Sequence, residues 1–178
     1  AHAEVNALAK INYKGENTKV YITLEPCSHF GKTPPCAEAL IKAGVKKVFI
    51  AILDPNPLVS GKGFKLLQDS GIEVEVGLLE KEAQEINRGF IKRMKSGLPF
   101  VTSKIAMSLD GRTAMKSGES KWITSEASRN DVQILRSLNQ AIMTGSGTIK
   151  NDNPMITVRS ENTDSKPLRV VIDSNNII

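Results

Sequence analysis

The feature that most constrains the fold is a regular alternation between short apolar runs and stretches with helical spacing. Val20 to Leu24 is rich in β-forming residues, and AEALIKAG after it carries apolar side chains at helical spacing up to Gly44. Residues 45–53 form a second apolar run, GFKLLQDSG suits a short helix, and residues 72–76 alternate apolar and polar side chains. This alternation predicts βαβ units around a parallel sheet, so the expected fold class is α/β.

A break in the pattern divides the chain. Glu80 to Lys95 is a charge-rich segment that predicts one further helix, and Ser96 to Pro99 interrupts it with glycine and proline. We therefore predict two domains, residues 1–96 and residues 99–178.

The second domain is also expected to be α/β. FVTSKIAM predicts a strand, and SLDGRTAMKSGES predicts a polar loop. Ser125 predicts the start of a helix that runs to about Asn139, because serine is a favourable N-cap. AIMTG and LRVVID predict two more strands.

Composition limits the class of protein. Two cysteines in 178 residues are too few for a disulfide scaffold, and no apolar run reaches the 18 or so residues of a membrane span. We therefore expect a cytoplasmic protein without a membrane partner. The net charge of +5 favours anionic partners, but the cationic residues are scattered and aromatic residues make up only 4% of the chain. Single-stranded nucleic acid usually binds to a basic groove with stacking aromatics, so it is not the expected partner.

Both cysteines, Cys27 and Cys36, lie in TLEPCSHFGKTPPCAEAL, which leaves three interpretations open: a disulfide, two structural thiols, or a metal site. Cys36 follows two prolines at a predicted helix start, where the helix dipole is expected to lower a thiol pKa and favour a metal-binding thiolate. His2 could supply a nitrogen ligand, and Glu4 lies two residues further on. If His29 also bound the metal, the site would instead be a closed Cys2His2 structural module.

The motifs that surround these residues resemble known enzymes. H-A-E followed by P-C and a second cysteine resembles the zinc-dependent cytidine deaminase superfamily, although eight residues separate the cysteines where the usual signature has two. LEPCSHFGKTPPCAEALI, with DPNP and GKG downstream, resembles the deaminase domain of a family of bifunctional riboflavin-biosynthesis enzymes. KIAMSLDGRTA, SGESKWITS, GSGTIKNDNP and RVVIDS are similar to the start of that family's reductase domain.

The resemblance implies a cytidine-deaminase-like α/β/α zinc domain, followed by the start of a dihydrofolate-reductase-like α/β domain. It implies that His2, Cys27 and Cys36 bind zinc and that Glu4 moves protons. Three protein ligands leave a fourth position for water, as hydrolytic deamination requires. The implied reactions are deamination of a phosphoribosylated diaminopyrimidinone and NADPH-dependent reduction of the ribosyl group of the aminouracil product.

The resemblance also implies the substrate and cofactor contacts. The deaminase substrate would contact His29, Lys32, Asp54 and Asn56. The reductase substrate would contact Ser120, Arg136, Ile156 and Arg159. NADPH would contact Ala106, Trp122, Thr148 and Asp152. No G-x-G-x-x-G follows a strand, so a Rossmann dinucleotide site is not predicted.

The alternatives are a nucleic-acid or nucleoside deaminase and a closed structural zinc-binding module. The expected partner is a small phosphorylated pyrimidine, not nucleic acid, and a homo-oligomer stays open. The H-A-E motif already begins at residue 2, and the family's reductase extends further than Ile178, so we expect a fragment that lacks both ends.

Overall fold

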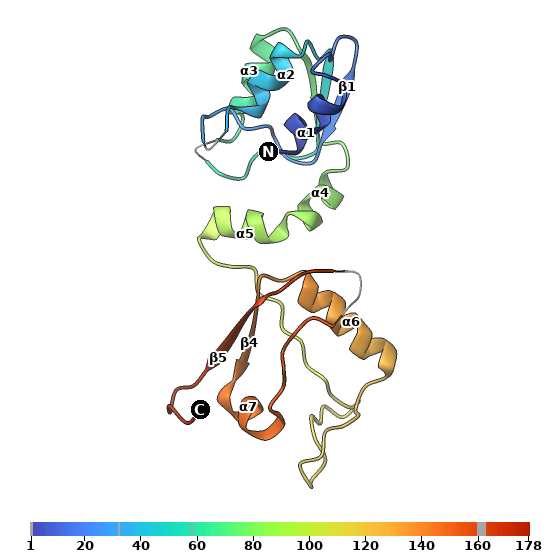
Figure 1. Ribbon diagram of the computed structural model, residues 1–178, viewed down its shortest axis with the longest axis vertical. Coiled ribbons are helices and arrows are strands. Elements are labelled where there is room, and N and C mark those ends of the chain that lie inside the picture. The colour runs from blue at the N-terminus through green and yellow to red at the C-terminus, as the bar shows by residue number, and fades with distance from the viewer. Residues whose placement is uncertain (1, 32, 58, 160–162) are drawn as a thin grey trace. The chain divides into compact units, whose positions relative to one another are not determined.

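The computed structural model describes residues 2–31, 33–57, 59–159 and 163–178. The chain forms two compact units, Ala1–Thr102 and Ser103–Ile178 (Figure 1). The predicted domain limits, 96 and 99, fall a few residues before the division between the units and stay a prediction.

A three-stranded parallel sheet is the centre of the first unit. It contains β1 (Lys19–Ile22), β2 (Lys47–Ile50) and β3 (Glu73–Val76), in the order β1-β2-β3. Val20 pairs with Val48, and Val48 pairs with Val74, so apolar side chains form a row across one face. The predicted βαβ arrangement is therefore confirmed for this unit.

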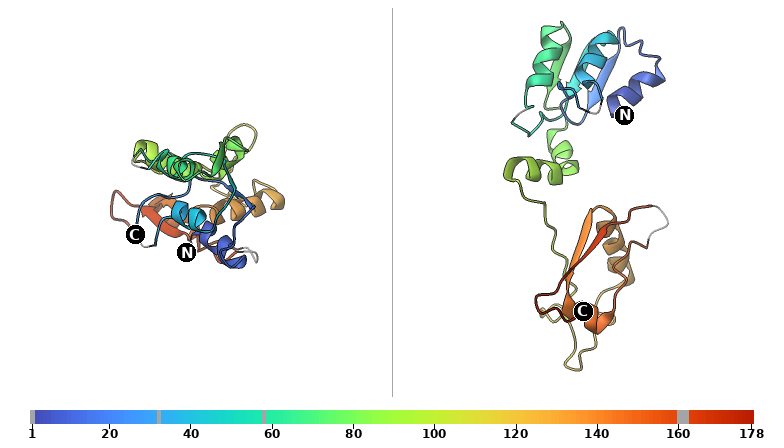
Figure 2. Two further views of the ribbon diagram at one scale, coloured as in Figure 1. Left: turned by 90° about the horizontal axis from the view of Figure 1, so that it is seen from above. Right: turned by 60° about the vertical axis from the view of Figure 1, so that its left-hand side comes forward.

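Three helices supply the apolar residues that pack on this face. They are α1 (Ala3–Lys10), α2 (Cys36–Lys42) and α3 (Lys62–Asp69); α2 and α3 are the crossovers between successive strands (Figures 1 and 2). The buried core of the unit consists of Leu8, Ala37, Leu40, Ala43, Val45, Val48, Ile50, Leu67 and Ile72. Gly44 ends the α2 region with φ +74°, the left-handed conformation that favours glycine at a helix end.

The opposite face of the sheet carries an aromatic stack. The rings of Tyr21 and Phe49 lie 4.6 Å apart and nearly parallel, with the Lys47 ammonium 4.8 Å from the Phe49 ring.

The predicted single helix over residues 80–95 is wrong, because the structure has α4 (Glu80–Ile86) and α5 (Arg88–Ser96). The two helices are separated at Asn87, whose backbone leaves helical geometry while its side chain donates to the carbonyl of Ala83.

The second unit contains a two-stranded parallel sheet of β4 (Ala141–Gly145) and β5 (Leu168–Ile172). Before it comes α6 (Glu126–Ser137), and α7 (Ser146–Asp152) follows β4 directly. The hydroxyl of Ser125 accepts a hydrogen bond from the Ser128 amide at 3.2 Å, which confirms the predicted N-cap.

The predicted strand at FVTSKIAM is wrong. Within the described ranges, residues 100–107 pair with no strand, and the sheet of this unit consists of β4 and β5. An apolar, β-branched sequence favours an extended backbone, but a strand also requires a partner with the right register, which local sequence does not supply. Among the described residues, no helix is both long and apolar enough to cross a membrane.

Candidate active site

The carboxyl ends of β1 and β2 form the edge at which the predicted first-unit residues gather. Beyond the strands proper, the Ala51 amide donates to Ile22 O and the Glu25 amide donates to Ile52 O, both at 2.9 Å. The segments that follow β1 and β2 therefore run side by side beyond the sheet. In open α/β sheets, ligands bind outside this edge.

Three elements bring the predicted metal ligands together. His2 is the N-cap of α1, Cys27 lies in the loop after β1, and Cys36 is the first residue of α2. His2 Nδ1 lies 3.2 Å from Cys36 Sγ and 3.7 Å from Cys27 Sγ. All three ligand atoms lie within 4.8 Å of one another.

These separations fit a tetrahedral zinc ion. With Zn–S of about 2.3 Å and Zn–N of about 2.0 Å, tetrahedral N and S ligands lie about 3.5 Å apart. The two N–S distances from His2, 3.2 and 3.7 Å, bracket this value. One imidazole and two thiols are also among the ligand sets that zinc prefers.

The thiols are not joined to each other. Cys27 and Cys36 are both free, and the backbone N–H of Cys36 donates to Cys27 Sγ at 3.2 Å. His29 is exposed and does not belong to the cluster that the described histidine, cysteine and acidic residues form. The disulfide interpretation is therefore wrong for this structure, and the cluster offers three protein ligands.

The pKa of the Cys36 thiol is higher than the sequence led us to expect. Burial raises the pKa of Cys36 well above its usual range, and the nearby charges and hydrogen bonds of Glu4 and Cys27 raise it further. The predicted lowering by the helix start is thus outweighed in the metal-free protein. A bound cation would reverse the balance, since a thiol that coordinates a metal loses its proton. The same contacts place the Glu4 carboxylate, on α1, beside the cluster.

The predicted contacts to the deaminase substrate lie in two loops. His29 is exposed in the loop between β1 and α2, and Lys32 lies outside the described residues. Asp54 and Asn56 are half-buried in the segment between β2 and α3. The Asn56 amide donates to Asp54 Oδ1 at 2.8 Å, an Asx-type turn that fixes one residue relative to the other.

Three of the predicted reductase residues lie close together in the second unit. Arg136, on α6, donates from Nη1 to Thr157 O at 2.9 Å, and the Arg159 amide donates to Gln133 Oε1 on the same helix at 3.0 Å. Burial and the charge of Arg159 lower the pKa of the Arg136 guanidinium, so the two cations influence each other. Ile156, between them in sequence, is buried with φ +50°. Two neighbouring guanidinium groups suit a phosphate.

The remaining predicted residues are spread over several elements of this unit. Thr148 and Asp152 lie exposed on α7, directly after β4. Ala106 and Ser120 are half-buried in the long segment before α6. Trp122 is exposed, and the Arg129 guanidinium lies 4.4 Å from the centre of its ring.

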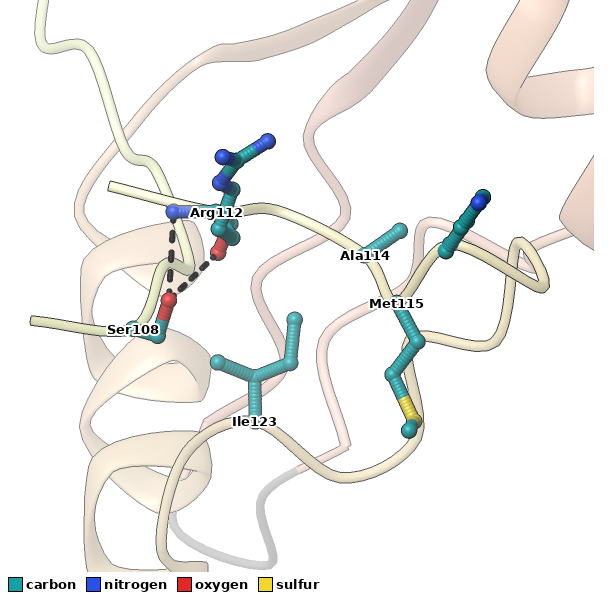
Figure 3. A pocket seen from close by; sticks show the side chains of 6 residues that line it. Ser108, Arg112, Ala114, Met115 and Ile123 are labelled. Atoms are coloured by element: carbon teal, nitrogen blue, oxygen red, sulfur yellow. Dashed lines mark hydrogen bonds between the residues drawn. The ribbon is translucent and has the colours of Figure 1, made fainter. Parts of the chain in front are cut away.

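A pocket of about 600 Å³ also lies in the second unit (Figure 3). Ser108 and Arg112 form one side, where the Arg112 amide donates to Ser108 Oγ at 3.1 Å and that hydroxyl donates back to Arg112 O at 3.3 Å. Its lining residues are Ser108, Arg112, Ala114, Met115, Lys116 and Ile123. None of these was predicted as a site residue.

Two family models match separate parts of the chain. Residues 1–52 match the cytidine and deoxycytidylate deaminase zinc-binding region, and residues 99–178 match the RibD C-terminal domain. RibD of Bacillus amyloliquefaciens is 53% identical over 174 residues, which cover 98% of this chain and 47% of that protein. RibD of Escherichia coli K12 is 49% identical over 187 residues, covering 98% of this chain and 51% of that protein. The chain belongs to the RibD family.

Solved structures in the RibD family have the same fold. RibD of Acinetobacter baumannii superposes with a TM-score of 0.93 at 51% identity, over 100% of this chain and 51% of that one. A diaminohydroxyphosphoribosylaminopyrimidine deaminase/5-amino-6-(5-phosphoribosylamino)uracil reductase of Thermotoga maritima superposes with a TM-score of 0.91 at 40% identity, over 99% of this chain and 51% of that one. The chain thus spans about half the length of the RibD relatives that it matches.

Two residues that sequence reasoning missed stand out beside the RibD motifs. Glu25, within the quoted LEPC stretch, is buried with 4% of its surface exposed. Arg129 stacks on Trp122 and also donates to Thr124 O at 2.6 Å. Glu25 could have been noticed from the sequence, because it is an acidic residue directly after a predicted apolar strand. The sequence gives no comparable signal that Arg129 contacts the tryptophan.

Proposed function

We propose that this chain carries catalytic parts of a bifunctional deaminase and reductase of riboflavin synthesis. The deaminase domain, residues 1–96, would deaminate a phosphoribosylated diaminopyrimidinone. The reductase domain, residues 99–178, would reduce the ribosyl group of the aminouracil product with NADPH. The observation that carries the proposal is the cluster of His2, Cys27 and Cys36, with Glu4 beside it at the carboxyl edge of a parallel sheet.

The three clustered side chains would hold zinc. Their ligand atoms lie at separations that fit tetrahedral zinc, and the group includes no fourth protein ligand among the described residues. When bound, zinc supplies a Lewis acid that lowers the pKa of water towards about 7. The open position favours a hydrolytic site over a closed structural module.

Glu4 would move the protons of the deamination. Its carboxylate would take a proton from water and deliver it to the pyrimidine ring nitrogen. It would then carry a second proton, from the hydroxyl added at the ring carbon, to the amine, which leaves as ammonia while that carbon becomes a carbonyl. Its position beside Cys36 supports this role, because the proton acceptor must lie next to the reacting water. His29, Lys32, Asp54 and Asn56 would orient the pyrimidine through hydrogen bonds.

The second unit would bind the deaminated product and the cofactor. Arg136 and Arg159 would hold its phosphate, since planar guanidinium groups bond phosphate oxygens in pairs. Ser120 and Ile156 would complete the substrate contacts. NADPH supplies a hydride when bound, and its proposed contacts are Ala106, Trp122, Thr148 and Asp152.

The proposed partner is therefore a small phosphorylated pyrimidine, in the cytoplasm and without nucleic acid or membrane. The low aromatic content and the scattered positive charges argue against a nucleic-acid deaminase.

The first test uses the full-length protein that contains this chain. Metal analysis should find one zinc in the deaminase domain, and Cys36→Ser should remove it, because neutral serine offers no thiolate. Glu4→Gln should keep zinc while ammonia release falls at least about 10²-fold, the scale of a lost general acid/base. Full zinc content in Cys36→Ser, or near-normal ammonia release in Glu4→Gln, would contradict the proposal. Glu75→Gln, on exposed β3, is the matched carboxylate control.

A further inference from the structure

Glu25 is a buried carboxylate to which the proposed deamination gives no role. Among the described residues, it is the one charged side chain that is buried, with 4% of its surface exposed. Burying an ionised carboxylate costs free energy unless hydrogen bonds compensate for the lost water. Its partners therefore show what the residue does.

Four backbone N–H groups donate to this carboxylate. Oε2 accepts from Asp54 and from Gly61, each at 2.9 Å. Oε1 accepts from Gly63 at 2.8 Å and from Phe64 at 3.1 Å. A carboxylate accepts through both oxygens and donates through neither, so it matches four donors as no neutral side chain does.

Two of these bonds cap α3 from a distant part of the sequence. Gly61 is the N-cap of α3 and has no side chain with which to cap the helix. The first N–H groups of a helix have no partner within the helix, and those of Gly63 and Phe64 are satisfied by Glu25 instead. A negative charge at this position is also favourable to the helix dipole.

The other two bonds fix the segment that precedes α3. Asp54 and Gly61 lie at its two ends. Both amides donate to the same oxygen, Oε2 of Glu25, which fixes these two residues near each other. Asp54 Oδ1 in turn accepts from the Asn56 amide. A continuous set of hydrogen bonds therefore links Glu25 to both predicted substrate residues of this segment.

Glu25 is also tied to the cysteine loop. It lies two residues before Cys27, and its own amide donates to Ile52 O at 2.9 Å. The carboxylate thus joins the loop that carries a metal ligand to the segment that carries Asp54 and Asn56.

We propose that Glu25 is a positioning residue that holds Asp54 and Gly61 beside the cysteine loop, so that Asp54 and Asn56 are preorganised for the pyrimidine. The inference rests on the proposed deaminase function and deepens it. Glu25 touches neither metal nor substrate in this role. It acts on substrate binding through Asp54, and zinc binding and proton transfer proceed without it.

Glu25→Gln in the full-length protein tests the inference. A glutamine retains one acceptor oxygen and places an NH2 group against the second pair of N–H donors, so one pair is released. We expect KM for the phosphoribosylated diaminopyrimidinone to rise about tenfold or more, the scale of a lost hydrogen bond to a charged group. Zinc content should stay at one per chain, and kcat should stay within about threefold. Glu75→Gln on exposed β3 is the control and should leave both constants unchanged.

A double-mutant cycle separates positioning from general support of the fold. If Glu25 acts through Asp54, Glu25→Gln should raise KM no more than about twofold in an Asp54→Ala background. The inference would be overturned by an unchanged KM in Glu25→Gln, by an equal loss of kcat, by additive effects in the cycle, or by loss of zinc or of the fold.

The wild-type protein distinguishes the two levels of failure. If it binds no zinc and releases no ammonia, the proposed function fails and the inference falls with it. If it is active while Glu25→Gln behaves like Glu75→Gln, only the inference about Glu25 is wrong.

Discussion

Replacing Gly63 with alanine tests how closely the first turn of α3 packs against the cysteine loop. A Cβ at this position would lie 2.0 Å from the carbonyl oxygen of Pro26 and 3.2 Å from its carbonyl carbon. Real Cβ atoms essentially never come within 3.0 Å of such an atom, so helix and loop must separate by about 1 Å. The obstacle is backbone, which cannot rotate away as the end of a flexible side chain could.

This separation determines the expected loss of stability. A shift of about 1 Å would stretch the bonds from the Gly63 and Phe64 amides to Glu25, now 2.8 and 3.1 Å, beyond hydrogen-bond distance. Hydrogen bonds to charged groups contribute about 1.5–3 kcal/mol each, so losing two costs about 3 kcal/mol or more. Overpacking a well-packed site costs about 1–3 kcal/mol by itself, which is the same order.

Urea unfolding of the full-length protein measures this loss, with circular dichroism for the backbone and zinc release as a probe of the first unit. At a urea m-value of about 1–3 kcal/mol per molar, Gly63→Ala should lower the midpoint by about 1 M or more. Gly89→Ala is the matched control: Gly89 lies within α5 with nothing within 4 Å of the new Cβ, so alanine should stabilise the helix by up to about 1 kcal/mol. An unchanged midpoint in Gly63→Ala would refute the packing argument.

Two further predictions concern charge. Arg136→Ala in the full-length protein should raise the reductase KM for the deaminated intermediate about tenfold, because a charge-assisted phosphate contact is lost. Ammonia release should stay unchanged, and the control variant Arg93→Ala should change neither reaction. Equal slowing of both reactions in Arg136→Ala would contradict a phosphate role. Burial raises the pKa of Cys36, so the metal-free thiol holds its proton at neutral pH and must release it to bind zinc. Zinc affinity, measured by competition with a chelator between about pH 7 and 8, should therefore rise with pH by about tenfold per unit for the proton that Cys36 releases, and a flat profile would contradict a protonated Cys36 thiol.

Local patterns were sufficient to predict most of the helices and strands. The helix after Ser125 was predicted from a capping signal that acts within one turn, and the hydroxyl bond to Ser128 confirms it. The apolar spacing before Gly44 and the alternation in β3 likewise depend on residues close in sequence.

Errors arose where the outcome depends on distant contacts. FVTSKIAM has strand-forming residues, but residues 100–107 pair with no strand among the described residues. The charge-rich segment 80–95 consists mostly of helix-forming residues, yet the helix breaks at Asn87, where the side chain bonds a backbone carbonyl. Asparagine competes with helical hydrogen bonds in this way, but whether it breaks a helix depends on packing that the sequence does not show.

In the candidate site too, features of local sequence could be predicted and features that depend on distant contacts could not. His2, Cys27 and Cys36 could be grouped from the sequence, because the chain contains only two cysteines and two histidines and the motifs around them resemble a known zinc-dependent family. The role of Glu25 could not be predicted, since its partners are the backbone amides of Asp54, Gly61, Gly63 and Phe64, and every residue type except proline offers an amide. Recognising a carboxylate that binds main-chain donors requires the fold itself.

The acidity of Cys36 shows why a correct local rule can give the wrong sign. A helix start does favour a thiolate, but the thiol of Cys36 is buried and lies beside Glu4 and Cys27, two groups that disfavour a further negative charge. These opposing contributions all concern a site without a cation. The same arrangement, an imidazole and two thiols with a carboxylate beside Cys36, is favourable to a divalent ion, whose charge is the largest in such a site. The raised pKa and the fit to zinc therefore have one cause: potential negative charges gathered around the buried Cys36 thiol, where a metal ion can balance them.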